Sequence, residues 1–511
     1  MSTATRRQRF FGGLKLEDHK PPGQQAFQVA DIPDELILPL SQHSGAPSLP
    51  LVKPGDRVLR GQTIAGAQGA LSLPLHAPSS GTVSAIEPRP VAHPSGLTAE
   101  CIVIQTDGQD EALANPEWPA TTAFQNLSAE TIVQRLQLAG IAGLGGAVFP
   151  SFFKLRGQAP IHTLVLNGAE CEPYIRCDDV LMQTRAEDVL RGAQILLQAS
   201  GAEHCLIGVE DNKTEAISAL RTAAQMLQIP ARVIAVPTRY PQGGSNQLIQ
   251  TLTGSEVPSE GLPLDIGIVS FNVATAAAVW DAIALARPLI SRLVTVAGEG
   301  ISAPQTFEVR LGTPFASLIA QAGGIKDTAA DLIMGGPMMG FKVSHAQVPI
   351  IKASNCVLVR PTKPNEPARA CIRCGECAQV CPARLLPQQL YWHARSRNFE
   401  RAEAYNLFDC IECGCCAQVC PSHIPLVQYY RNAKSELRAQ ATERSKSEFA
   451  RQRHEARQLR LQAEKQAREE ARRRKKLAMQ AAAKKQQAEA DPVAAALARA
   501  QAKQGSENQS S

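Results

Sequence analysis

Eight cysteines in the last third of the chain recur in two copies of one spacing. The first copy runs from Cys371 to Pro382 and reads C-I-R-C-G-E-C-A-Q-V-C-P, and the second runs from Cys410 to Pro421. Both fit C-x2-C-x2-C-x3-C-P, in which three thiolates wrap one iron–sulfur cluster and the fourth reaches its neighbour. The spacing therefore predicts two [4Fe-4S] clusters and one-electron transfer between them.

This rule predicts a separate ligand set for each cluster. The first set is Cys371, Cys374, Cys377 and Cys420, and the second is Cys381, Cys410, Cys413 and Cys416. A pair of zinc sites is the alternative, but such sites favour C-x2-C pairs without a third close Cys or a trailing Pro. Cys415 falls outside the spacing and is expected to be a bystander. The remaining cysteines lack ligand spacing and are expected to be buried apolar residues: Cys101, Cys171, Cys177, Cys205 and Cys356.

A glycine-rich segment, Gly143-Leu-Gly145-Gly146-Ala-Val-Phe149-Pro-Ser-Phe-Phe-Lys154, follows a helix expected to begin after an N-cap at Ser128. Glycines let the backbone approach an anion closely, and the N–H groups of such a loop can cradle a phosphate. Lys154 could add a positive charge. A purely structural turn is the alternative.

A second polar motif, Asn167-Gly-Ala-Glu170-Cys-Glu172-Pro173, follows a predicted buried strand over residues 161–166. Ligands of open α/β sheets bind at the carboxyl ends of the strands. Two acids and an Asn at such an edge could hold ribose hydroxyls or a nicotinamide amide, and a solvated acidic turn is the alternative.

The pattern of apolar and turn-forming residues changes several times along the chain. Residues 30–105 combine short apolar runs with Pro-Gly turns and resemble the sandwich domains that carry biotin or lipoyl groups, although no Lys lies at the expected hairpin tip. Residues 128–290 alternate between helical and strand patterns, which predicts α/β layering. A small strand-rich region follows, and a Pro-rich linker at 360–367 leads to the cysteines.

Charge is concentrated in the tail. The net charge is +6, yet residues 431–491 alone carry eighteen Lys and Arg against nine Asp and Glu. Their composition predicts a long solvated helix, followed by about twenty disordered residues. The helix could be a spacer, contact an acidic partner or lie on anionic lipid. Nucleic-acid binding is disfavoured because aromatics are 5% of the chain and no recognised nucleic-acid fold accompanies the charge.

Neither a secretory signal nor a membrane-spanning segment is expected, because the first twenty residues lack an apolar core and no apolar run approaches about 20 residues. A cytoplasmic location follows as the default. Thiols stay reduced there, so clustered cysteines indicate a metal centre rather than disulfides.

The glycine loop and the Asn167–Pro173 motif together resemble the NADH-binding flavoprotein subunit of respiratory complex I. That family has G-R-G-G-A-G-F-P-T-G-x-K and N-A-D-E-x-E-P, but Leu144, Val148 and Phe152 stand where it has Arg, Gly and Gly. The order of parts resembles the RnfC subunit of the Rnf/Rsx ion-translocating electron transport complex still more closely, from about residue 10 to 430. Shared segments include Tyr240-Pro-Gln-Gly-Gly and Phe271-Asn-Val-Ala-Thr, although Ser245 replaces an acid common in the family after the first of these.

The resemblance implies a multidomain α/β plus β fold. Its expected parts are an N-terminal segment (1–29), a barrel-sandwich-like β domain (30–110), an α/β flavoprotein-like domain that binds NADH and FMN (125–290), a small β-grasp-like, soluble-ligand-binding domain (291–355), a double-cluster bacterial ferredoxin-like domain (362–430) and a C-terminal basic helical tail (431–511).

The resemblance also implies a function. The chain would be a peripheral subunit on the cytoplasmic face of the bacterial inner membrane, joined to other subunits and exchanging electrons between NAD(H) and ferredoxin-type carriers. The cofactors would be FMN and two [4Fe-4S] clusters. The implied flavin and nucleotide residues are Gly143, Gly145, Gly146, Phe149, Lys154, Asn167, Glu170 and Glu172. Two alternatives stay open: an electron-wiring and docking subunit without nucleotide chemistry, and a non-redox scaffold, which leaves the eight spaced cysteines unexplained.

Overall fold

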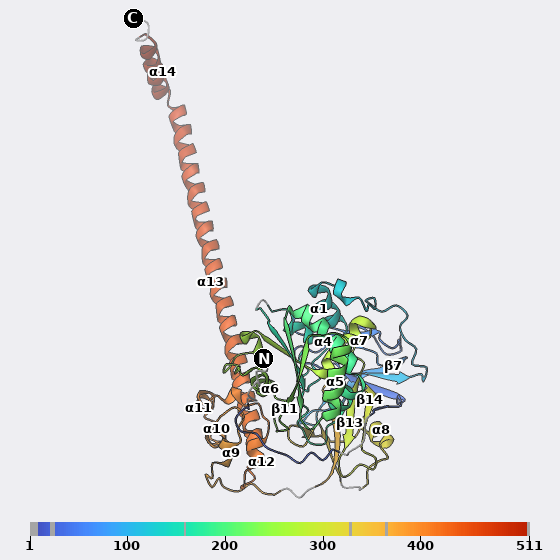
Figure 1. Ribbon diagram of the computed structural model, residues 1–511. Coiled ribbons are helices and arrows are strands. Elements are labelled where there is room, and N and C mark those ends of the chain that lie inside the picture. Colours follow the sequence, from blue (N-terminus) through green and yellow to red (C-terminus); the bar gives the residue numbers. More distant parts are fainter. Residues whose placement is uncertain (1–8, 21–25, 158–159, 327–329, 363–365, 508–511) are drawn as a thin grey trace, which may run out of the picture. The chain divides into compact units, whose positions relative to one another are not determined.

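The computed structural model describes residues 9–20, 26–157, 160–326, 330–362 and 366–507 (Figure 1). The chain divides into two compact units, Met1–Ala433 and Lys434–Ser511. Within the first unit, the described strands form sheets of six, four, four and three strands.

A β domain forms the first part of the chain. Its strands are β2 (Glu35–Pro39), β3 (Leu49–Pro50), β4 (Arg57–Val58), β5 (Thr63–Gly66), β6 (Leu75–His76), β7 (Gly81–Pro90) and β8 (Thr98–Thr106). They form two sheets, with the orders β2-β8-β7-β4 and β3-β5-β6. Alternate residues of β2 and β8, such as Leu36, Leu38, Ile102 and Ile104, are buried in a shared core. Ile37 and Val103, which lie between them, are also buried, so both faces of these two strands are covered.

The next part is an α/β domain with a parallel sheet in the order β11-β10-β9-β12. Its strands are β9 (Thr163–Gly168), β10 (His204–Glu210), β11 (Ala231–Val236) and β12 (Ile268–Asn272). Its helices are η1 (Phe124–Asn126), α1 (Ala129–Leu138), α2 (Ser151–Lys154), α3 (Cys177–Thr184), α4 (Ala186–Ser200), α5 (Thr214–Met226), α6 (Ser245–Thr253), η2 (Pro263–Ile266) and α7 (Val273–Ala284). The predicted cap of α1 is confirmed, because the Ser128 side chain accepts a hydrogen bond from the Thr131 amide.

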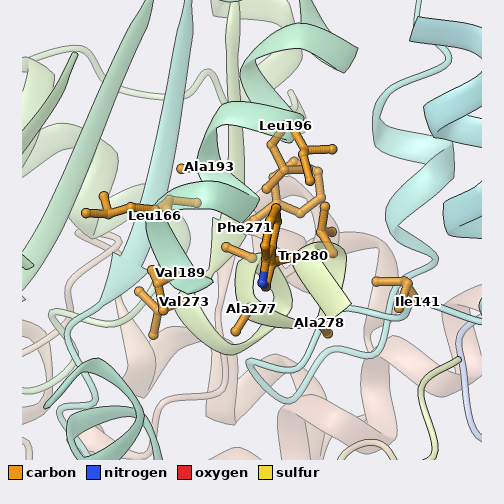
Figure 2. Packing of buried hydrophobic residues seen from close by; sticks show 14 of the residues in the cluster. Ile141, Leu166, Val189, Ala193, Leu196, Phe271, Val273, Ala277, Ala278 and Trp280 are labelled. Atoms are coloured by element: carbon orange, nitrogen blue, oxygen red, sulfur yellow. The ribbon is translucent and has the colours of Figure 1, made fainter. Parts of the chain in front are cut away.

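Helices cover both faces of this sheet, which explains why the central positions of its strands are mostly apolar. Leu166 of β9 and Phe271 of β12 pack with Val189 and Ala193 of α4 and with Trp280 of α7 (Figure 2). On the opposite face Val165 packs with Leu248 and Ile249 of α6.

A six-stranded sheet follows, with the order β1-β14-β13-β17-β15-β16. Its elements are β1 (Gln28–Val29), β13 (Ser291–Ala297), β14 (Gln305–Arg310), α8 (Phe315–Gln321), β15 (Ala330–Met334), β16 (Phe341–Lys342) and β17 (Cys356–Pro361). Two strands come from outside the expected range of 291–355. β17 is buried between β13 and β15, because its run Cys356-Val-Leu-Val is apolar at every position, and β1 comes from the N-terminal segment.

The cysteine module consists of short helices: α9 (Glu376–Gln379), α10 (Pro387–Arg395), α11 (Phe399–Ala404), η3 (Leu407–Asp409) and α12 (Cys415–Gln418). The sequence repeat is also a backbone repeat. Arg373 and Glu412 both have left-handed φ, and so do Gly375 and Gly414, each of which precedes a four-residue helix. Part of the predicted linker before this module, residues 363–365, lies outside the described residues.

The second unit is helical. It contains most of α13 (Leu426–Ala490) and all of α14 (Pro492–Glu507), so the predicted long helix is confirmed. The expectation of about twenty disordered terminal residues is wrong for those in α14. Pro492 suits the first turn of a helix, and the Asp491 carboxylate accepts hydrogen bonds from the Val493 and Ala494 amides as an N-cap. Among the described residues, every helix is too short or too polar to cross a bilayer.

Candidate cofactor sites

The eight predicted cluster cysteines lie around two separate cavities. One cavity is lined by Cys371, Cys374, Cys377 and Cys420, together with Tyr391 and Leu426. The other is lined by Cys381, Cys410, Cys413 and Cys416, together with Leu390 and Tyr430. Each cavity therefore takes three thiols from one sequence copy and the fourth from the other copy, as the spacing rule requires.

The donor set of each cavity fits a [4Fe-4S] cluster. Four thiols converge on each within mostly apolar walls, and such walls tune a cluster by excluding solvent. Cys415 is fully buried and lines the second cavity beside Cys413. The sequence placed Cys415 outside the ligand spacing, and no sequence signal shows that it shares this cavity.

The predicted flavin and nucleotide residues converge at a different place, the carboxyl ends of β9 and β12. The strand order changes direction between these two strands, which is where ligands of such sheets bind. Asn272 is the last residue of β12 and Asn167 is the last but one of β9, and the two are paired in register. A Cβ added to Gly145 would lie 3.3 Å from the Asn272 Cβ, so the glycine loop passes directly over this point.

The loop offers free backbone donors. Gly145, Gly146 and Ala147 are exposed, and none of the hydrogen bonds found among the described residues uses their amides. Gly146 has a φ of +100° and has open space where a Cβ would lie. The loop is closed by the Gly143 amide, which donates to the Phe149 carbonyl at 2.9 Å. Free amides beside open space fit the phosphate of a flavin nucleotide.

The loop is also held from the β domain. Ser44 donates from its amide to the Val148 carbonyl and from its hydroxyl to the Ala147 carbonyl, both at 3.1 Å. Val148 has a φ of +42°, which a β-branched residue rarely adopts. Leu144 is buried, donates to the Thr275 hydroxyl and accepts from Arg292.

Lys154 lies on the sheet side of the loop. The Lys154 ammonium donates to the Ser270 carbonyl at 2.8 Å and lies 5.1 Å from the centre of the Phe271 ring. Burial lowers the pKa of Lys154 to about 8. Phe149 packs edge-on against Phe153. Lys154 therefore lies under the sheet edge rather than over the free amides.

The two predicted glutamates already have backbone partners. The Glu170 carboxylate accepts from the Asp178 and Asp179 amides at the start of α3, at 2.6 and 3.1 Å. The Glu172 carboxylate accepts from the Met338 and Met339 amides at 3.2 and 2.9 Å. Burial raises the pKa of Glu170 to about 8 and that of Glu172 to about 7.

Asn167 orders the same loop. Its side-chain amide donates to the Gly243 carbonyl at 2.8 Å, and its side-chain oxygen accepts from the Ala169 amide at 3.1 Å. The side chains of Asn167, Glu170 and Glu172 therefore bind backbone groups, and through these bonds they fix the loops at the carboxyl ends of the strands.

Two residues that the sequence did not single out as site residues are central to this region. Asn272 donates at 2.6 Å to Asp178, whose pKa is raised by burial, and it supports the glycine loop. The Tyr240 hydroxyl donates to the Cys413 carbonyl at 2.6 Å and joins the α/β domain to the second cysteine cavity. The only sequence signal for either was their presence in segments shared with the Rnf family.

That contact distinguishes the two cavities. We call the cavity of Cys381, Cys410, Cys413 and Cys416 the proximal site, because Tyr240 of the α/β domain touches it, and the other cavity the distal site. The loop held by Glu172 also reaches the proximal site, since a Cβ added to Gly414 would lie 3.1 Å from the Met338 carbonyl.

A larger cavity, of about 730 Å³, lies between α3, α4, α7 and the six-stranded sheet. Leu144, Asp178 and Arg292 line it, but none of the eight predicted flavin and nucleotide residues is among its lining residues. Its lining thus reaches the glycine loop at Leu144 but includes none of Gly145, Gly146 and Ala147.

Comparisons with known families cover most of this architecture. Residues 8–109 match the RnfC barrel sandwich hybrid domain, and residues 136–281 match the Nuo51 FMN-binding domain. Residues 293–342 match the SLBB domain, and residues 370–424 match the 4Fe-4S dicluster domain.

Curated relatives match nearly the whole chain. The RnfC subunit of the ion-translocating oxidoreductase complex of Pseudomonas aeruginosa is 49% identical over 90% of this chain and 59% of its own length. The corresponding subunit of Serratia proteamaculans is 47% identical over 97% of this chain and 69% of its own length. The chain thus spans less than two thirds of the first of these relatives. A solved NAD+-reducing [NiFe]-hydrogenase structure matches with a TM-score of 0.44 and 18% identity over 63% of each chain.

The fold and the matched domains define a multidomain flavoprotein of the iron–sulfur type, with FMN and a pair of [4Fe-4S] clusters as its cofactors. More particularly, the chain belongs to the family of RnfC subunits of ion-translocating oxidoreductase complexes.

Proposed function

We propose that this chain transfers electrons between NAD(H) and ferredoxin-type carriers as a peripheral subunit of an ion-translocating membrane complex. The observation that carries the proposal is the Tyr240–Cys413 contact, which joins the ligand edge of the α/β domain to one of two adjacent four-thiol cavities. Family membership supports the ion-translocating partners, and the matched FMN-binding domain supports the flavin.

The glycine loop would hold the flavin phosphate through the amides of Gly145, Gly146 and Ala147. FMN would supply the conversion between a two-electron hydride donor and one-electron acceptors. Gly143 and Phe149 keep the loop closed by their main-chain hydrogen bond. Asn167 and Glu170 order the loop that follows β9, so that its backbone would offer a fixed edge to a bound flavin and nucleotide.

Glu172 and Lys154 would act through position and charge. Glu172 holds the loop at Met338, which lies between the ligand edge and the proximal site. Lys154 places its ammonium under β12, where burial lowers its pKa to about 8. Removing either side chain would move backbone that borders the ligand.

The proximal site would be the first to exchange electrons with the ligand edge, and the distal site would follow it. Tyr240, Cys413 and Cys415 share one packed cluster with Cys171, which belongs to the Asn167–Pro173 motif. This packing gives a continuous route of buried atoms from the motif to the proximal thiols.

A second candidate is an electron-wiring and docking subunit that does no nucleotide chemistry of its own. The observation in its favour is that Glu170 and Glu172 are already occupied by backbone amides, and that Leu144 is buried in the core. In that case the nucleotide site would belong to another subunit, while both cluster sites would stay as described.

Anaerobic mixing of the purified chain with NADH, with and without added FMN, separates the two candidates. Flavin bleaching is followed optically, and reduced clusters are followed by EPR. The proposed function predicts that NADH reduces both kinds of centre when FMN is present, and that Gly146→Val, which fills the open space beside the amides, abolishes FMN binding. Clusters that dithionite reduces but NADH never reaches, together with no FMN binding, would instead support the wiring subunit.

A further inference from the structure

The N-terminal segment runs between two domains that are far apart in the sequence. Its residues 10–20 contact the α/β domain on one side and the cysteine module on the other. The sequence offered no role for this segment beyond its position before the first domain.

Two adjacent aromatic residues at its start pack against different domains. The guanidinium of Arg239, from the α/β domain, lies 5.9 Å from the centre of the Phe10 ring. The guanidinium of Arg384, from the cysteine module, lies 5.8 Å from the centre of the Phe11 ring. Phe10 is buried, whereas Phe11 is 45% exposed.

The two glycines that follow fit against backbone on both sides. The Gly13 amide donates to the Val380 carbonyl at 2.9 Å, one residue before Cys381 of the proximal site. A Cβ on Gly12 would lie 2.7 Å from the Val380 carbonyl and 2.8 Å from the main chain of Cys381. A Cβ on Gly13 would lie 2.6 Å from the Tyr240 carbonyl. Both glycines have left-handed φ, so no other residue fits here without strain.

The segment then reaches the predicted ligand edge. Leu14 and Tyr240 exchange two main-chain hydrogen bonds, at 2.7 and 2.8 Å. Further along, the Asp18 carbonyl accepts from the Tyr174 amide, and the His19 ring stacks on Tyr174 at 4.9 Å. Finally the Lys20 ammonium, which is buried, donates to the Glu170 carbonyl at 3.0 Å.

We propose that residues 10–20 form a strap that holds the cysteine module, and with it the proximal site, at a fixed position against the Asn167–Pro173 loop. The strap contacts Cys381 at one end and Glu170 at the other. It therefore runs from the proximal site to the ligand edge, the two places between which electrons would pass. Its importance for electron transfer rests on the proposed function, whereas its role in holding the module does not.

The test compares Gly12→Ala with Gly108→Ala in the full chain with its clusters. Gly12 has a φ of +69° and Gly108 a φ of +70°, but a Cβ on Gly108 would meet nothing within 4 Å. Both variants bear the cost of a left-handed alanine, and only Gly12→Ala forces the strap away from Cys381. Phe11→Ala is a milder second variant, because its exposed side chain can be removed without opening the core.

Hydrogen exchange gives a readout that does not depend on NADH. The reporters are the Tyr240 amide, which donates to Leu14, and the Glu260 amide, which donates to Asp409 of the module. We expect exchange at both to quicken by about tenfold or more in Gly12→Ala, and less strongly in Phe11→Ala, but not in Gly108→Ala. Unchanged protection at Glu260 in both strap variants would overturn the proposal.

Electron delivery is measured on the same samples. NADH should bleach the flavin at the wild-type rate in Gly12→Ala while reducing the clusters about tenfold more slowly, because small displacements of reacting groups slow reactions steeply. Dithionite reduction and iron content should match the wild type. If the module loosens and the clusters are still reduced at the wild-type rate, the strap does not set the electron-transfer geometry. If NADH fails to bleach the wild-type flavin, the proposed function fails, and hydrogen exchange alone decides whether the strap holds the module.

Discussion

The hydroxyl of Tyr240 donates a hydrogen bond of 2.6 Å to the main-chain carbonyl of Cys413, so an α/β domain and a cluster-binding loop meet through two buried residues. The peptide on which Tyr240 lies is itself paired with Leu14 of the strap. The strap, the α/β domain and the cysteine module therefore meet at Tyr240, next to Cys413 of the proximal site.

Tyr240→Phe tests how much this hydrogen bond contributes to stability and to electron transfer. Because it leaves a buried carbonyl without its donor, we expect a loss of about 1–3 kcal/mol in stability. Ser48→Ala is the matched control: its buried hydroxyl donates to the Leu73 carbonyl at 2.8 Å, inside the β domain and away from both cluster cavities. Both variants should lower the unfolding midpoint, but only Tyr240→Phe should slow NADH-driven cluster reduction. Equal reduction rates in the two variants would show that the contact is purely structural.

Val148→Gly should stabilise the glycine loop. Val148 has a φ of +42°, and a non-glycine residue held in a sparsely populated region costs about 1–3 kcal/mol. Glycine removes that strain but gives up the partial packing of the valine, so we expect a net gain of about 1 kcal/mol. Thermal unfolding measures the gain. Ala147→Gly, at a neighbour without positive φ, should give no gain, and a similar gain there would contradict the strain argument.

The assignment of cluster ligands predicts which pairs of cysteine variants lose the same cluster. Cys374→Ser and Cys420→Ser should abolish the same EPR signal and about half of the iron, although these residues belong to different sequence copies. Cys381→Ser and Cys413→Ser should abolish the other signal. Cys415→Ser should retain both. Loss of one signal by Cys374→Ser and of the other by Cys420→Ser would contradict the assignment.

Glu172 should make stability depend on pH. Burial raises the pKa of Glu172 from 4.5 to about 7, so between these values the folded chain holds a proton that the unfolded chain has released. Its contribution to stability is therefore complete below about pH 4.5 and is lost as the pH rises to about 7. Denaturation at pH 5 and pH 7.5 should show a smaller difference for Glu172→Gln than for the wild type. A steeper pH dependence in the variant would refute the assignment.

The sequence predicted those features that depend on local spacing. Two copies of C-x2-C-x2-C-x3-C-P sufficed to predict which thiols share a cavity, and the Ser128 cap sufficed to predict where α1 begins. The Ser128 cap and the three thiols that each copy gives to one cavity depend on residues only a few positions apart. The fourth thiol of each cavity comes from the other copy, and it was assigned by the known pattern of two-cluster ferredoxins.

Features that depend on contacts between residues far apart in the sequence could not be predicted from local spacing. Glu170 and Glu172 are acids at the end of a strand, which suggested nucleotide ligands, but their carboxylates accept from α3 and from the Met338 loop. The six-stranded sheet takes β1 and β17 from outside its expected range, because pairing between remote strands leaves no local signal. The strap was missed for the same reason.

In the proposed route, electrons from NADH enter through the proximal site and then pass to the distal site. It is tested most directly by anaerobic EPR of Cys413→Ser and Cys374→Ser chains mixed with NADH and FMN, with dithionite as the control for the cluster that each variant retains. The account predicts that NADH still reduces the proximal cluster in Cys374→Ser, and that it no longer reduces the distal cluster in Cys413→Ser. Rapid reduction of the distal cluster by NADH in Cys413→Ser would contradict it.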